Sequence, residues 1–278
     1  MRLLPIVIFV MTMMTTMSAQ THSCCTAPNT FASLASNDAF VAAHVEPLHM
    51  QYPTDGELQS IEVSGGSPAV FYAVEPKAPT SNVLLVFPEW WGLNEHIKRE
   101  ADALFTALDG KVRVIAVDLY DGVVAYTRDE AAQAMKNLNN DRAEAIINAI
   151  IVKQQANARI ATIGWCMGGG FALQAGIMAG QNAAAVVMYY GMPEKNVERL
   201  KTLRAPVLAI FASKDDWITP SVAKQFEKDM ESADKKLTVK SYAAPHAFAN
   251  PSNSEHDPVA TADAMSLAVA FLREHLKL

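Results

Sequence analysis

Continuous apolar runs alternate with amphipathic segments along most of this chain. Short apolar runs bounded by turn residues are typical of buried strands, and on this basis we expect strands at 70–74, 83–87, 112–117, 160–163, 184–189 and 206–212. A last strand is expected at 237–242, where apolar and polar residues are mixed. The amphipathic segments repeat their apolar positions at helical spacing and lie at 94–108, 129–137, 141–155, 220–232 and 258–276. Strands that alternate with helices predict an α/β fold, with a mostly parallel sheet covered by helices on both faces.

The first part of the chain breaks this plan. Residues 20–54 are rich in Thr, Ser, Asn and Ala and show no sustained period, so we interpret them as an N-terminal extension that follows the surface. The folded domain then spans 55–278. Half of the 278 residues are hydrophobic, which suits one domain with a sizeable core.

Residues 1–19 predict a signal peptide. Arg2 precedes an apolar stretch over 3–14 that has the size of a signal h-region and is short for a membrane span. Ala19 offers a cleavage site, although Met17 fits the usual small-residue pattern poorly. The alternatives are an uncleaved signal anchor and lipidation at Cys24. We expect an exported protein, periplasmic or secreted, with no stable membrane span after processing.

The net charge and the cysteine content limit which binding partners and which disulfide bonds are expected. The net charge is −6 and no basic cluster occurs, which argues against nucleic acid. Of three cysteines, Cys24 and Cys25 are adjacent, and this does not describe a disulfide framework. In an oxidising compartment Cys166 would have no obvious disulfide partner, and an unpaired thiol there favours a chemical role.

The turn after the 160–163 strand carries the most informative motif, Gly164-Trp165-Cys166-Met167-Gly168-Gly169. A strand, a sharp glycine turn and a small-residue helix are the context of a nucleophile elbow. The turn lifts the Cys166 side chain clear of the sheet, and the helix N-terminus favours its thiolate. The alternative is a buried structural cysteine.

A cysteine nucleophile needs a base and an orienting carboxylate, which follow it in chain order in sheet-top hydrolases. Asp215 follows the 206–212 strand, and His246 follows the 237–242 strand. We therefore assign them as acid and base. Asp216 is the alternative acid and His256 the alternative base.

The remaining histidines lack a comparable context; they are His22, His44, His49, His96 and His275. They form no metal-ligand spacing of the H-E-x-x-H kind. The sequence therefore predicts neither a metal site nor a cofactor.

Four separated stretches now add a family resemblance; they are 88–94 with Ile97-Lys98, 117–120, the 164–169 elbow, and the Asp215 and His246 segments. From about residue 55 to its end, the chain resembles the dienelactone hydrolase family of α/β-hydrolases. The cysteine in the elbow, together with Glu89, is the most discriminating feature. The resemblance implies a cofactor-free hydrolase of a small ester or lactone.

The resemblance also implies roles for single residues. Cys166 would form a thioester acyl-enzyme, with His246 as general base and acid held by Asp215. Glu89 would interact with the resting thiol and keep it protonated until substrate displaces it. Backbone N–H groups of Met167 and Trp90 would hold the oxyanion.

From the resemblance we expect Trp91 and Asn250 to contact the substrate. The alternative for Trp90 and Trp91 is that they only fill the core. Family members that take dienelactone carry an arginine where this chain has Asn250, and another where it has Gly122; Arg128 is the nearest arginine downstream. Asparagine offers a carboxylate neither charge nor a bidentate fork. An ester or lactone substrate is therefore better supported than an anionic diene.

Two readings from other classes stay open. A non-catalytic small-molecule binding protein could use the same fold, since a fold does not imply a function. A thiol-redox role for Cys166 is the second, although no resolving cysteine lies near it in the sequence. The sequence leaves the oligomeric state undetermined.

Overall fold

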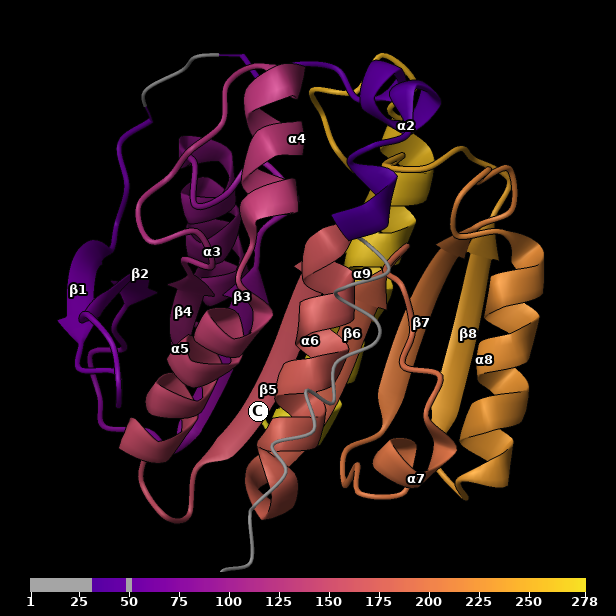
Figure 1. The fold of residues 1–278 in the computed structure, drawn as a ribbon. Coiled ribbons are helices and arrows are strands. Elements are labelled where there is room, and N and C mark those ends of the chain that lie inside the picture. Colours follow the sequence, from indigo (N-terminus) through magenta and orange to yellow (C-terminus); the bar gives the residue numbers. More distant parts are fainter. Residues whose placement is uncertain (1–31, 49–51) are drawn as a thin grey trace, which may run out of the picture.

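The computed structural model describes residues 32–48 and 52–278. In these residues an eight-stranded sheet has the order β1-β2-β4-β3-β5-β6-β7-β8. The β1–β2 and β2–β4 pairs are antiparallel, and every later pair is parallel. Helices α3 and α9 cover one face, and α5, α6 and α8 cover the other (Figure 1). The predicted mostly parallel α/β architecture is confirmed.

The strands are β1 (Glu57–Ile61), β2 (Ala69–Val74), β3 (Asn82–Phe87), β4 (Arg113–Val117), β5 (Arg159–Trp165), β6 (Ala183–Tyr189), β7 (Val207–Ala212) and β8 (Leu237–Tyr242). The α-helices are α2 (Asp38–Ala43), α3 (Glu95–Ala107), α4 (Arg128–Asn137), α5 (Asn140–Lys153), α6 (Met167–Met178), α7 (Val197–Leu200), α8 (Pro220–Ser232) and α9 (Pro258–Leu276). A short 3-10 helix covers Gly180–Asn182.

Burial explains why the strand predictions succeeded. All six residues of β7 are buried, as are all but the first residue of β3 and of β5. A central parallel strand must be apolar on both faces because helices cover both. The edge strands β1 and β8 have no buried residue and lack this signal; β8 was predicted all the same, whereas β1 was not. The short helices α2 and α7 were also missed.

The carboxyl ends of the parallel strands lie at one edge of the sheet. Glu89 follows β3, Cys166 follows β5, Tyr190 follows β6 and Asp215 follows β7. Helix α2 sits above this edge, near the upper ends of β6 and β7 in Figure 1. Parallel sheets place their sites at this edge, and residues far apart in the sequence meet here.

The predicted signal peptide, its cleavage site and Cys24 lie outside the described residues, as do His22 and His49. Across 32–48 and 52–278, the helices are each too short or too polar to cross a bilayer.

Candidate active site

Cys166 occupies a strained turn between β5 and α6. Its φ of 55° and ψ of −120° lie in a region that side-chain-bearing residues rarely adopt. Glycines make the turn tight: a Cβ on Gly168 would lie 2.3 Å from the Phe87 carbonyl oxygen, and one on Gly164 would lie 2.1 Å from the Gly168 oxygen. The geometry is that of a nucleophile elbow.

Three side chains from three strand ends meet at this turn. Nδ1 of His246 lies 2.6 Å from Oδ2 of Asp215, and Nε2 of His246 lies 3.3 Å from Sγ of Cys166. All three residues are buried. The Asp215 carboxylate can only accept a hydrogen bond, so Nδ1 of His246 carries the ring proton. Nε2 is then free to accept the proton of the Cys166 thiol.

Asp215 is held as a carboxylate. Burial favours its protonated form, but His246 and the backbone N–H groups of Trp217 and Ile218 outweigh burial and lower its pKa. Asp216, the alternative acid, is exposed to solvent. The structure thus brings Asp215, rather than its neighbour, to the histidine.

His256, the alternative base, lies in the turn that precedes α9 and does not join the triple. His96 bonds the Leu48 carbonyl through Nε2 at 2.9 Å, and His275 packs on Phe271. Of the histidines in the described ranges, only His44 accompanies His246 at the Cys166 thiol.

The Cys166 thiol is protonated at rest. Burial is the main cause that raises its pKa well above the usual value, and the nearby Glu89 adds to it. The backbone N–H of Met167, at the start of α6, acts in the opposite direction and is too weak to reverse the shift. The helix N-terminus alone therefore does not make a thiolate here.

Glu89 contacts Asn250 in this structure. The Asn250 amide donates a 2.6 Å hydrogen bond to Oε2 of Glu89. Burial raises the Glu89 pKa to about 7. His246 and the hydrogen bond from Asn250 stabilise the ionised carboxylate and act in the opposite direction, but burial has the larger effect. The interaction of Glu89 with the resting thiol, expected from the resemblance, is electrostatic here, because the thiol hydrogen bonds His246.

This raised pKa makes stability depend on pH. Between about pH 4.5 and 7 the folded state holds the Glu89 proton and the unfolded state has lost it, so stability falls as pH rises through this window. We expect Glu89→Gln to raise Tm by a few degrees at pH 8 and to leave it nearly unchanged at pH 4. Thermal unfolding followed by circular dichroism at both pH values checks this; an equal difference at both would contradict it.

Glu89, Trp91 and Asn250 line one small cavity of about 150 Å³, together with Pro47 and Trp165. The predicted substrate-binding residues Trp91 and Asn250 therefore face a common space beside the triple. Trp91 is buried, and so is Trp90.

The two predicted oxyanion donors come from adjacent strand ends. Met167 is the first residue of α6, where backbone N–H groups have no intrahelical partner. Trp90 follows β3, which pairs with β5. The roles of both N–H groups stay a prediction.

A family model described as "Dienelactone hydrolase family" matches residues 70–276. The chain belongs to the dienelactone hydrolase family. It is accordingly a hydrolase with an α/β-hydrolase fold.

Similar proteins cover most of the chain. Protein usf of Aquifex pyrophilus is 27% identical over 74% of this chain and 93% of its own length. Carboxymethylenebutenolidase 1 of Cupriavidus pinatubonensis is 23% identical over 76% of this chain and 95% of its own. Among solved structures, a dienelactone hydrolase-like promiscuous phosphotriesterase from metagenomic libraries has a TM-score of 0.68 at 19% identity, covering 80% of this chain and 99% of that one.

This dienelactone hydrolase family member has an N-terminal segment over its triad. Phe40 of α2 is fully buried, and its ring centroid lies 5.3 Å from those of Trp90 and Trp217 and 6.0 Å from that of His246. His44 ends the helix, buried against Trp90 and His246. Within the predicted extension, Phe40 and His44 stand one turn apart and face inward, so this part packs onto the site.

Little in the amino-acid sequence indicates this contribution. Residues 38–43 form a single helix of six residues, too short for a detectable period, and the N-cap Asn37 was its one local signal. The sequence offered no context that would place His44 at the site, where the structure places it. Burial lowers its pKa to about 3, with His246 adding to the shift, so its ring is neutral. Trp217 and Tyr190, whose rings pack edge-on against His246, were also missed.

Because Phe40 covers His246, its removal should open the site. We expect Phe40→Ala to increase the rate at which a water-soluble aromatic disulfide modifies Cys166, and to lower stability by roughly 3–5 kcal/mol, as core Phe truncations do. Thiol titration and thermal unfolding measure the two effects. Val259→Ala, at an exposed site on α9, is the control. An unchanged modification rate would show that α2 does not limit access.

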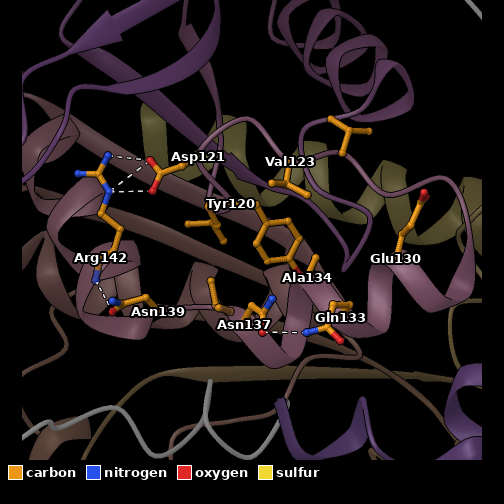
Figure 2. Close-up of a pocket in the computed structure, with 12 residues that line it drawn as sticks. Tyr120, Asp121, Val123, Glu130, Gln133, Ala134, Asn137, Asn139 and Arg142 are labelled. Atoms are coloured by element: carbon orange, nitrogen blue, oxygen red, sulfur yellow. Dashed lines mark hydrogen bonds and ion pairs between the residues drawn. The ribbon is translucent and has the colours of Figure 1, made fainter.

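A second cavity of about 420 Å³ lies beside Tyr120 (Figure 2). The Tyr120 hydroxyl donates to Sδ of Met167 at 3.2 Å, which links this cavity to the residue after the nucleophile. At its rim Arg142 pairs with Asp121 at 2.7 Å. Gly122 stands where family members carry an arginine, and its backbone N–H donates to Asp118. Arg128, the nearest arginine downstream, acts electrostatically on His44 and helps to lower its pKa.

Proposed function

We propose that this protein hydrolyses a small carboxylic ester or lactone by acyl transfer to Cys166. The observation that carries the proposal is the ordered, buried contact of Cys166, His246 and Asp215 at a strained elbow. The relatives named carboxymethylenebutenolidase support the substrate class.

The geometry supports a two-step reaction. Nε2 of His246 accepts the thiol proton as Sγ of Cys166 attacks the carbonyl carbon, and the N–H groups of Met167 and Trp90 hold the oxyanion. The tetrahedral intermediate collapses to a thioester while His246 protonates the leaving alkoxide. Water then attacks the thioester, His246 accepts its proton, and the acid leaves as the thiol re-forms.

Proton transfer within the site explains why a protonated resting thiol is compatible with catalysis. Asp215 stabilises the imidazolium that forms on His246. Between turnovers the thiol stays neutral through burial and the neighbouring Glu89. A neutral thiol is also slow to oxidise, which suits the exported location that we propose for the mature protein.

The decisive experiment is single-turnover trapping of the acyl-enzyme. Purified protein mixed with a short-chain nitrophenyl ester should release a burst of nitrophenol and gain the mass of one acyl group at Cys166, located by peptide mass spectrometry. A protein that binds the ester without a burst or an adduct would be a binding protein, and one that shows only peroxide-driven thiol cycling would have a redox role.

The charge at position 250 should influence substrate choice. Asn250 lines the small cavity and carries no charge, so we expect Asn250→Arg to raise kcat/KM for an anionic lactone relative to a neutral ester. The new arginine would also replace the amide that now bonds Glu89, so Asn250→Gln serves as an uncharged control. Unchanged selectivity in the arginine variant would contradict the proposal.

A further inference from the structure

His44, Cys166 and His246 form a buried trio of metal-ligating groups at the centre of the site. One ring nitrogen of each histidine and the Cys166 sulfur all lie within 4.8 Å of one another. The three residues come from α2, the elbow and the loop after β8. Their distance along the chain explains why no ligand spacing was visible in the sequence.

Both histidines present the same nitrogen to the thiol. Nδ1 of His44 donates to the Phe40 carbonyl oxygen at 2.7 Å, and Nδ1 of His246 donates to Asp215. Nε2 of each ring therefore carries the lone pair; that of His246 accepts the Cys166 S–H as long as the thiol is protonated. Nε2 of His44 is buried and has no hydrogen-bond partner among the described residues.

The unpartnered Nε2 of His44 indicates a missing ligand independently of the clustering of the three residues. A buried polar atom without a partner costs free energy and calls for an explanation. Metal-binding histidines commonly donate their other N–H to a backbone carbonyl or a carboxylate. His44 and His246 show one of these arrangements each.

We propose that Nε2 of His44, Nε2 of His246 and Sγ of Cys166 bind one Zn²⁺ ion. Imidazole and thiolate are ligands that zinc favours, and three protein ligands leave a fourth position for water. The Cys166 S–H gives its proton to solvent as the S–Zn bond forms. The ion thus occupies the groups that the proposed hydrolysis uses, which makes zinc a reversible inhibitor.

The geometry requires a modest adjustment. Bond lengths of about 2.3 Å to sulfur and 2.0–2.1 Å to nitrogen place tetrahedral ligand atoms roughly 3.3–3.6 Å apart. Sγ of Cys166 and Nε2 of His246 are already 3.3 Å apart, and the ligand nitrogen of His44 lies within 4.8 Å of both, so the remaining adjustment falls on His44. The Asp215 carboxylate favours a cation, as does Glu89 once it is ionised above about pH 7, and Arg128 opposes it.

Metal binding can be tested without reference to hydrolysis. Full-length protein freed of metal by chelation is titrated with Zn²⁺ in equilibrium dialysis, and with Co²⁺ in an absorption spectrometer. We expect one Zn²⁺ per chain, and a thiolate-to-cobalt charge-transfer band with the visible bands of a tetrahedral site. Cys166→Ser should remove the charge-transfer band.

The histidine variants identify the ligand that is new. We expect His44→Gln to weaken Zn²⁺ binding at least tenfold, a loss in the range produced even by second-shell changes, whereas His275→Gln on α9 should bind as wild type does. Stoichiometric binding that survives both His44→Gln and Cys166→Ser would overturn the proposal. So would a wild-type Co²⁺ spectrum without the thiolate band, a result that needs no variant to fold.

Discussion

Cys166→Ala should reduce turnover of a short-chain nitrophenyl ester to below about a hundredth of the wild-type rate. The substitution removes the sulfur that attacks the carbonyl, and with it the thioester intermediate. It deletes little volume, and alanine at this position keeps the positive φ of the elbow no worse than cysteine does. Activity is measured beside circular dichroism, which should show an intact fold.

The acyl adduct provides the control for this variant. Wild-type protein should gain the adduct in a single turnover and Cys166→Ala should not, even at high substrate concentration. Residual turnover above about a hundredth of wild type, with the fold intact, would mean that acyl transfer to Cys166 is not the main route.

His246→Ala should be nearly as damaging. General acid–base catalysis by a positioned side chain contributes roughly 10²–10⁴-fold, and here the same ring removes the thiol proton and protonates the leaving group. The thiol pKa is raised by burial, so without the imidazole few molecules would hold a thiolate at neutral pH. The loss should therefore appear in kcat, and it should lessen as pH rises.

A second histidine variant serves as the control, because it distinguishes the loss of the general base from a loss of activity caused by removing any histidine. His256 lies in the turn before α9, outside the triple, and His256→Ala should keep wild-type kcat. If His246→Ala also kept its kcat, or if both variants lost activity equally, the assignment of the base would be wrong.

The fold was predictable because its core strands are apolar on both faces. β3 and β7 are almost continuous hydrophobic runs, and β5 is largely apolar, which indicates a covered parallel sheet. The edge strand β1 pairs on one side only and has mixed, exposed residues. Its place in the sheet depends on tertiary pairing with β2, which no local pattern encodes.

The site likewise has a part that the sequence predicts and a part that it does not. Cys166, Asp215 and His246 stand directly after strands, so topology predicts that they meet. The N-terminal part of the site follows no such rule: Phe40 and His44 reach the triple from a six-residue helix whose position depends on packing against Trp90 and Trp217. Only the three-dimensional arrangement shows that a buried imidazole faces the thiol.

The docking of α2 also sets an order of events during synthesis. The ribosome makes Phe40 and His44 long before Trp217, β8 and the His246 loop, so part of what buries these two side chains emerges late. Contacts between distant parts of a chain form slowly because loop closure must precede them. A nascent chain therefore carries an uncovered thiol and an apolar helix until its final strands arrive, and this interval is when chaperones have the most to protect.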